Sequence, residues 1–414
     1  MRKMVLLLVL FCCVACEQAP VTRALENAPP KAGNSTQAAA EAQQAQVTIG
    51  PYVSKAGKDR AEVFFDVAPA QPPAKLVLRW SADGEAKEKE LNSAGGKNAV
   101  TLEGLTAGSE YEYEILAETK PGKLEAISGG RFTTAPEGPG QFRFVVYGDS
   151  RSNVKEHTQI ADAIASEKPE FVVHTGDYAS DGRHSENWEN QFFRPAEKML
   201  KGAAFFPALG NHEHRAPIYF DYFGLPKDKA YYSFTWGQID FFVIDTETDF
   251  SPTSEQWKWL DAALAASKAP WKMTAQHVPG ISGGTHGFNR QVNQYLRPLY
   301  EKYGVDLAFN GHDHTYERTK PIASQAKGGG PPTSAVTYIV TGGGGAELYR
   351  IKKNKWDVAA CSCYNYVIVD AAPDALRIVA KGRDRKVTDS FTMKKNDPNY
   401  LADTVDFESI RKDY

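Results

Sequence analysis

Cysteine is scarce in this chain of 414 residues: there are five, and three of them lie within the first sixteen positions. Only Cys361 and Cys363 remain beyond that point, so a framework of several disulfides cannot stabilise the fold. The longest apolar run is too short for a membrane-spanning helix, which needs roughly 20 residues. With a formal net charge of −3, the chain also lacks the basic excess that is typical of nucleic-acid-binding proteins. The fold must therefore depend on a hydrophobic core, and the chain is long enough for two domains.

The N-terminus has the pattern of a secretory signal peptide over residues 1–15. Arg2 and Lys3 precede an apolar run that is too short to span a bilayer. Two small or apolar residues before Cys16 resemble the cleavage box of bacterial lipoproteins, which implies a lipid on Cys16 and a membrane as partner. An ordinary signal peptide is the alternative. Residues 16–45 are rich in Ala, Gln and Pro and predict a flexible linker. We therefore expect an exported lipoprotein on the periplasmic or outer face of a membrane.

Cys361 and Cys363 allow three interpretations. A disulfide between cysteines two residues apart is geometrically demanding, and two such thiolates could instead bind a metal. The interpretation that we favour is two small residues near the start of a strand, with one or both thiols free.

Residues 46–136 predict a small all-β module. Short runs alternate apolar and polar side chains and are separated by Gly, Pro and Asn. Leu105 and Ala107 followed by Tyr111 resemble the tyrosine corner of fibronectin type III domains, so a sandwich of that type is expected. Packing or spacing beside a catalytic domain is its expected role, and binding of a sugar or polymer is the alternative. The expected strands are 61–67, 75–80, 111–117 and 131–136.

The segment 141–395 predicts an α/β domain, because predicted strands alternate with helical stretches. Towards its end the pattern becomes all-β, so a pair of sheets flanked by helices is expected. Residues 396–414 are assigned to a C-terminal tail. The expected helices are 154–167, 186–201, 253–267 and 289–303, and the late strands are 335–341, 364–370, 375–380 and 387–393.

Five short apolar runs each end at a residue type that binds metals. Four of the five place Gly directly before the candidate ligand, and glycine allows the sharp turn that lets the next side chain project from a strand end. Open α/β sheets bind ligands at that carboxyl edge. Two carboxylates, an amide oxygen and three imidazoles suit a pair of divalent or trivalent ions. Five unrelated strand ends are the alternative, which their joint occurrence disfavours. The candidates are Asp149, Asp177, Asn211, His277, His312 and His314.

The order Gly-Asp, Gly-Asp, Gly-Asn-His-Glu, His and Gly-His-x-His resembles the calcineurin-like metallophosphoesterases, and the run from Gly311 to Arg318 resembles purple acid phosphatases. The resemblance covers about residues 46–393. It implies an αββα catalytic sandwich after a fibronectin type III-like domain, with two metal ions, Fe, Zn or Mn. By this likeness, one ion is bound by Asp149, Asp177 and His314, and the other by Asp177, Asn211, His277 and His312.

Two positions depart from the family patterns. Many relatives carry a His two residues after the first Asp, where this chain has Arg151, and arginine cannot bind a metal. Purple acid phosphatases carry a metal-binding Tyr three residues after the second Asp, where this chain has Ser180. Tyr178 is close in sequence but is expected to point elsewhere. The first metal site is therefore expected to have three protein ligands plus water.

The resemblance also implies roles in catalysis. His212 is expected to protonate the leaving group or stabilise the transition state, steered by Glu213 or the Asp149 loop; a structural loop histidine is the alternative. Asn211 and His286 are expected to contact the substrate, although His286 could also be an exposed loop residue. Arg151 could grip phosphate oxygens in a bidentate manner, or it could pair with a nearby acid.

The predicted function is hydrolysis of a small phosphomonoester by a metal-bound hydroxide in an exported phosphatase. A phosphodiesterase or nucleotide hydrolase could use the same dinuclear centre. A non-enzymatic binding protein with a weakened metal site is the third alternative, suggested by Arg151 and Ser180. The loops around the site decide among these functions, and their shape cannot be predicted from the sequence.

Overall fold

The computed structural model describes residues 45–68, 75–91, 95–324, 334–395 and 403–405. All described residues belong to one compact unit. The predicted signal peptide, Cys16 and nearly all of the linker lie outside the described residues. Among the described helices, none combines the length and the apolar character needed to cross a membrane.

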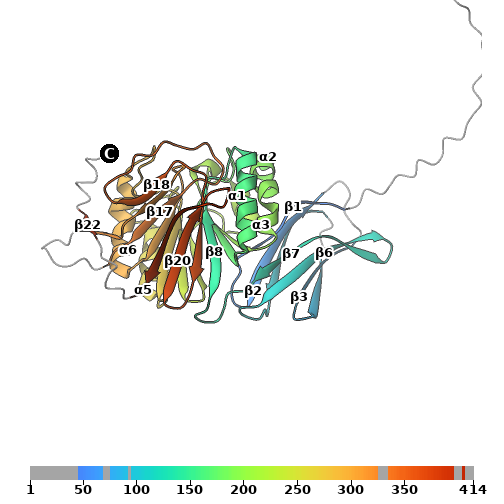
Figure 1. Cartoon of the computed structure of the whole chain (residues 1–414). Coiled ribbons are helices and arrows are strands. Elements are labelled where there is room, and N and C mark those ends of the chain that lie inside the picture. The colour runs from blue at the N-terminus through green and yellow to red at the C-terminus, as the bar shows by residue number, and fades with distance from the viewer. Residues whose placement is uncertain (1–44, 69–74, 92–94, 325–333, 396–402, 406–414) are drawn as a thin grey trace, which may run out of the picture. The chain divides into compact units, whose positions relative to one another are not determined.

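Two large sheets form the core of this unit (Figure 1). The nine-stranded sheet has the order β21 (Val387–Lys394), β20 (Ala375–Lys381), β19 (Tyr366–Ala371), β8 (Phe142–Tyr147), β9 (Phe171–His174), β10 (Ala204–Pro207), β1 (Val47–Ser54), β2 (Arg60–Val67) and β5 (Gly96–Glu103). The seven-stranded sheet has the order β11 (Tyr232–Trp236), β12 (Ile239–Ile244), β13 (Trp271–Gln276), β14 (Leu307–Asn310), β17 (Thr337–Thr341), β15 (Tyr316–Thr319) and β18 (Asp357–Cys361).

The two sheets pack face to face because their strands are apolar on both sides. Phe144 and Val146 of β8 lie in one buried cluster with Phe241 of β12, and the rings of Phe144 and Phe241 meet edge to face. Val145 and Tyr147 point to the opposite face, where they join a second cluster built with helices. Strands buried on both faces are typical of parallel sheets covered by helices, and β8, β9 and β10 do pair in parallel.

Helices cover the outer faces of both sheets, as the predicted αββα sandwich requires (Figure 1). The predicted helix at 154–167 is confirmed by the observed helix Val154–Glu167. The Asn153 side chain accepts a hydrogen bond from the Glu156 amide at its start, and Lys168 ends it in a left-handed conformation. The nine-stranded sheet is covered by α1 (Val154–Glu167), α2 (Ser185–Asn187), η1 (Trp188–Phe193), α3 (Arg194–Leu200) and α4 (Pro217–Phe223), and the seven-stranded sheet by α5 (Glu255–Ala266), η3 (Val292–Leu296) and α6 (Arg297–Tyr303).

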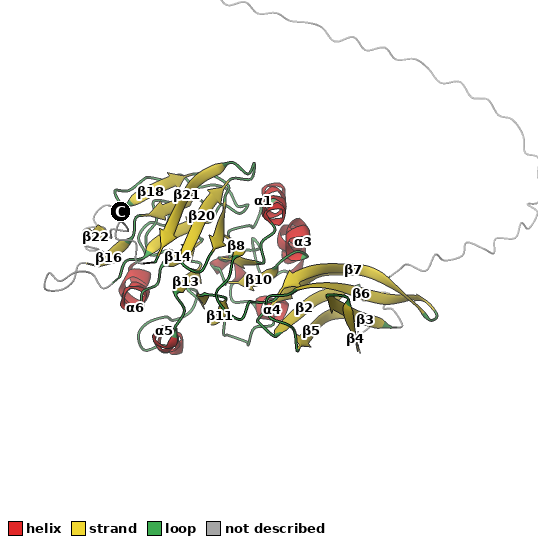
Figure 2. Ribbon diagram, turned by 60° about the horizontal axis from the view of Figure 1, so that its bottom comes forward, coloured by secondary structure: helices red, strands yellow, loops and turns green. Residues whose placement is uncertain are grey.

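The N-terminal β-module contains a four-stranded sheet in the order β4 (Glu85–Leu91), β3 (Leu76–Ala82), β6 (Glu110–Lys120) and β7 (Lys123–Thr133) (Figure 2). The Tyr111 hydroxyl accepts a hydrogen bond from the Thr106 amide at 2.8 Å, which is the contact expected of a tyrosine corner. The rest of the module, β1, β2 and β5, is continuous with the nine-stranded sheet, because β1 pairs in parallel with β10. A short parallel pair joins β16 (Ile322–Ser324) to β22 (Asp403–Val405) in the C-terminal segment.

Candidate metal centre

The loops that follow β8, β9, β10, β13 and β14 bring the six predicted metal ligands together. Within each sheet these strands run in parallel, so their carboxyl ends lie at one edge. Asp149, Asp177 and His312 have positive φ angles of 57°, 62° and 71°. Side chains other than glycine rarely adopt this conformation, and such residues cluster at functional sites. The backbone therefore holds three candidate ligands in strained positions that only a packed surrounding can maintain.

One set of ligand atoms surrounds Nε2 of His277. The other ring nitrogen, Nδ1, donates to the Thr175 carbonyl at 2.9 Å, which fixes the orientation of the ring. Nε2 lies 2.9 Å from Oδ1 of Asn211, 3.1 Å from Nδ1 of His312 and 3.4 Å from Oδ1 of Asp177. These are the four residues expected to bind the second ion, and their donor atoms face one another.

The other set consists of Asp149, Asp177 and His314, whose candidate ligand atoms lie within 4.8 Å of one another. His314 donates from Nδ1 to the Glu347 carbonyl at 2.6 Å, so the lone pair on Nε2 points into the site, 3.6 Å from Oδ1 of Asp149. The structure therefore groups the three residues expected to bind the first ion, with Asp177 shared between both sets.

The electrostatics of this cage favour a bound cation. Burial alone would lower the pKa of His277, but Asp177 and Asp149 raise it to about 9. Burial lowers the pKa of His314 to about 4, so this ring is neutral, as a ligand must be. Burial raises the pKa of Asp149 well above its usual range. A proton on His277 thus lies beside the Asp177 carboxylate in the place where a metal ion would balance its charge.

The donor set fits metal ions. It combines carboxylate oxygens, one amide oxygen and imidazole nitrogens, which suit Fe, Zn or Mn better than a soft metal such as Cu(I). Glycine makes the cage compact: a Cβ atom on Gly210 would collide with Oδ1 and the amide of Asp177, and one on Gly311 would lie 2.5 Å from Oδ2 of Asp149. The residues that are present can hold one ion in each set, with Asp177 between them.

Comparison with known proteins is consistent with this geometry. Residues 142–316, which include all six ligand candidates, match the model of the calcineurin-like phosphoesterase family. The chain contains a calcineurin-like phosphoesterase domain. The phosphoesterase domain and the β-module together also resemble the structure of a purple acid phosphatase from yellow lupin seeds, with a TM-score of 0.71 and 21% identity, over 86% of this chain and 75% of that one.

Among curated proteins, the chain is similar to a plant protein and a human protein. It is 26% identical over 364 residues to "Probable inactive purple acid phosphatase 1" of Arabidopsis thaliana, which covers 74% of this chain and 59% of the relative. It is 24% identical over 389 residues to "Acid phosphatase type 7" of Homo sapiens, covering 80% and 84%. The chain thus spans only 59% of the length of this Arabidopsis relative.

His212 lies beside the ligand cage of the phosphoesterase domain. Its amide donates to Oδ1 of Asp177 at 3.0 Å, and its Nε2 lies 3.9 Å from Oδ2 of the same carboxylate. Nδ1 donates to the Ser180 carbonyl at 2.7 Å, so a carbonyl orients the ring. The expectation that Glu213 or the Asp149 loop steers His212 was therefore wrong, because Glu213 points away to other partners.

Glu213 connects two metal-binding loops, a role that the sequence did not reveal. Its buried carboxylate accepts hydrogen bonds from the amides of Asp177, Tyr178 and Gly210, each at 2.9 Å. Burial and the nearby Asp177 raise its pKa to about 8. The Gly-Asn-His-Glu pattern was the only signal for this residue, and the pattern does not show that the acid binds backbone amides.

The structure places the two remaining substrate-binding candidates next to the ligands. His286 is exposed, and its ring stacks on that of His312 at a centroid distance of 3.8 Å. Arg151 contacts Asp177 and His314. Tyr178 points away, as predicted: its hydroxyl donates to the Ala208 carbonyl, and its ring stacks on His174. Tyr349, which sequence reasoning missed, stacks on His314 at 4.0 Å.

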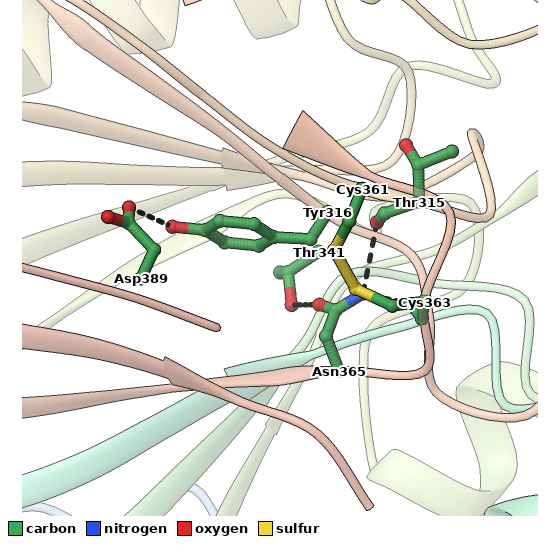
Figure 3. The surroundings of a disulfide bond; sticks show 7 residues. All are labelled: Thr315, Tyr316, Thr341, Cys361, Cys363, Asn365 and Asp389. Carbon is green, nitrogen blue, oxygen red and sulfur yellow. Dashed lines mark hydrogen bonds between the residues drawn. A yellow bond between two sulfur atoms is a disulfide. The ribbon is translucent and has the colours of Figure 1, made fainter. Parts of the chain in front are cut away.

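A polar network behind the His312–His314 turn supports the ligands from the far side (Figure 3). The Asn365 amide donates to the Thr315 carbonyl and accepts from the Thr341 hydroxyl. Next to it, Cys361 and Cys363 form a disulfide. The preferred interpretation of these cysteines as free thiols was therefore wrong. The turn between them brings the two side chains together, which residue spacing alone could not show.

Proposed function

We propose that this protein is a metal-dependent phosphatase that hydrolyses small phosphomonoesters. One observation carries the proposal: donor atoms of Asp177, Asn211 and His312 all lie within 3.4 Å of Nε2 of His277, and Asp149 and His314 complete an adjoining set around the same aspartate. Such a cluster of lone pairs is costly unless cations occupy it.

The two ions, when bound, would neutralise phosphate oxygens and lower the pKa of water so that a nucleophile forms near neutral pH. The chain itself supplies the ligands and their orientation. Thr175 and Glu347 accept the Nδ1 protons of His277 and His314, so that both rings present Nε2 to the site. Without these carbonyls the rings could rotate or change tautomer.

His212 is the proton donor in this proposal. Because Ser180 holds Nδ1, the second proton of the imidazolium form resides on Nε2, which faces the cage. From there it can be transferred to the leaving oxygen of the ester. His286 and Tyr349 lie beside the ligand histidines and would contact the phosphate or its ester group.

A second function is favoured by a specific relative. The chain is 26% identical over 274 residues to a "Nucleotide pyrophosphatase/phosphodiesterase" of Hordeum vulgare, which covers 56% of this chain and 74% of the relative. A diesterase would use the same ligands and differ in the walls of the pocket. The name of the Arabidopsis relative includes the word inactive, which keeps a binding protein as the third candidate.

The test combines metal content with hydrolysis of p-nitrophenyl phosphate and bis(p-nitrophenyl) phosphate. Turnover of the monoester alone supports the phosphatase, and preference for the diester supports the second function. Failure on both substrates with metal bound supports the binding protein.

We expect His212→Ala to keep its metal and to lower kcat by about 10²–10⁴-fold, the usual contribution of general acid catalysis. His214→Ala is the matched control, because His214 is exposed and lies only two residues away. Unchanged turnover in His212→Ala would remove this residue from the mechanism.

Export and attachment through Cys16 belong to the same proposal and are supported by the N-terminal sequence pattern. The mass of the mature N-terminal peptide tests them. A diacylated cysteine at position 16 is the expected result, and an unmodified N-terminus would contradict it.

A further inference from the structure

The guanidinium of Arg151 occupies the set formed by Asp149, Asp177 and His314. Its Nε lies 3.3 Å from Oδ2 of Asp177, and its Nη2 lies 3.4 Å from Nε2 of His314. Its Nη1 lies 3.3 Å from the Ser152 hydroxyl. The cation therefore uses two of the three lone-pair donors that a metal ion would need at this site.

These contacts are those of a largely, but not fully, buried cation. The Arg151 side chain is only 16% exposed, and that of Asp177 is 2% exposed. His314 can only accept at Nε2, since its Nδ1 proton is committed to Glu347. Arginine remains protonated at every accessible pH and carries its donors in a fixed planar arrangement. An ion entering this set must therefore displace the guanidinium and overcome its charge.

The neighbouring set around His277 has no guanidinium or ammonium group among the described residues; an ion that enters it displaces the proton on His277 instead. Among the described residues, the recorded partners of Nε2 of His277 are all potential metal ligands: Oδ1 of Asn211, Nδ1 of His312 and Oδ1 of Asp177. No lysine or arginine side chain in the described ranges is recorded at the Asn211 or His312 ligand atoms. The Arg151 guanidinium contacts the Asp177 carboxylate at Oδ2, whereas Oδ1 is the oxygen that lies near His277.

We propose that Arg151 is a built-in competitor that makes the Asp149–Asp177–His314 site conditional. The His277 site fills first, and the second ion binds only at higher metal concentration, when the guanidinium leaves its two partners. Activity then depends on metal supply in two steps. The inference rests on the proposed function, because it takes these residues as metal ligands.

The release of Arg151 also links metal binding to substrate binding. Once displaced, the guanidinium stays at the edge of the site, because Arg151 lies only two residues after Asp149 in the chain. There it can bind a phosphate oxygen. A phosphate anion should therefore strengthen the binding of the second ion, because it gives Arg151 a new partner. Inorganic phosphate serves as the probe for this effect.

The experiment is a Mn²⁺ titration of the full chain, followed by calorimetry and by electron paramagnetic resonance. In the wild type we expect two dissociation constants that differ by about 10–100-fold, the range in which residues next to the ligands tune metal affinity. The spectrum should change from isolated Mn²⁺ to a coupled pair only when the weaker site fills. Inorganic phosphate should lower the Mn²⁺ dissociation constant of the weaker site.

Three variants separate the competitor from its structural role. Arg151→Ala should lower the Mn²⁺ dissociation constant of the weaker site by about 10–100-fold and leave that of the tighter site unchanged. Arg151→Lys keeps the charge without the planar fork and should fall between the two. Arg183→Ala is the matched control, because Arg183 is 61% exposed and pairs with Asp181 on the surface, and it should behave as the wild type.

The outcomes distinguish the inference from the proposed function. The proposal that Arg151 competes with a metal ion would be wrong if the wild type had two equal Mn²⁺ dissociation constants. It would also be wrong if the larger dissociation constant were unchanged in both Arg151 variants. Either result would leave the metal centre itself intact. Absence of any Mn²⁺ binding by the wild type would overturn the metal centre and the inference together.

Discussion

Replacement of Glu213 by alanine should destabilise the protein and weaken metal binding at the same time. The carboxylate accepts hydrogen bonds from the amides of Asp177, Tyr178 and Gly210, and Glu213 is fully buried. Each buried amide that loses its acceptor costs about 1–3 kcal/mol. Three such losses should lower the free energy of unfolding by about 3–9 kcal/mol, a large part of the usual ~5–15 kcal/mol.

Glu213→Gln provides an intermediate test of this reasoning. One carboxylate oxygen, Oε2, accepts from Asp177 and Gly210, and the other accepts from Tyr178. A glutamine can keep its oxygen at the first position but must then place an amide group against the Tyr178 amide. We expect a loss of about 1–3 kcal/mol, smaller than for alanine.

Urea unfolding, followed by tryptophan fluorescence, measures these differences on metal-free protein. Glu186→Ala is the matched control, since Glu186 has a 68% exposed side chain and should change the stability by less than about 0.5 kcal/mol. Calorimetry on the same variants measures Mn²⁺ affinity. If Glu213→Ala behaved like Glu186→Ala in both assays, the hydrogen bonds seen in the structure would not hold the loops in place.

The other predictions concern acid stability and close packing. His157 is fully buried, and burial lowers its pKa from 6.5 to about 4. The unfolded chain therefore binds more protons between these values, so stability is lost as the pH falls from 6.5 towards 4, by up to about 3 kcal/mol from this residue. Urea unfolding at several pH values should show a loss that is smaller in His157→Gln than in the wild type by this amount, since other buried histidines keep their own contribution; parallel pH profiles would contradict it. Gly210→Ala should displace Asp177 and weaken Mn²⁺ binding at least about 10-fold, whereas Gly138→Ala, with open space around it, should bind normally. Equal affinities in the two variants would show that the close approach at Gly210 is not needed.

The architecture of the α/β domain could be predicted well from the sequence because the signals for it are local. Apolar runs that end in Gly and a ligand residue mark the ends of parallel strands, and β8, β9, β10, β13 and β14 end as predicted. The helix at 154–167 begins at a side-chain cap and could therefore be placed to the residue. β4 was missed because its sequence, EAKEKEL, is almost entirely exposed and has no apolar side to reveal it.

Contacts between distant segments could not be predicted. β1 pairs with β10 across roughly 150 residues of chain, a parallel pairing that leaves no mark in either strand. The carbonyl groups of Thr175, Ser180 and Glu347, which orient three histidines, belong to the backbone, so no residue type announces them. The same reason explains why the amide-binding role of Glu213 was not foreseen. The Cys361–Cys363 disulfide was considered but not preferred, because residue spacing does not show how the turn between the cysteines is shaped.

Six side chains from five loops are proposed to bind metal ions, and anomalous X-ray scattering from crystals of the Mn²⁺-loaded protein locates such ions without any assay of activity. We expect a strong peak among Asp177, Asn211, His277 and His312, and a second peak at Asp149 and His314 when the metal concentration is raised. Crystals whose ligand atoms are arranged as described, but which show no anomalous peak at either position after loading, would show that these side chains do not form a metal centre.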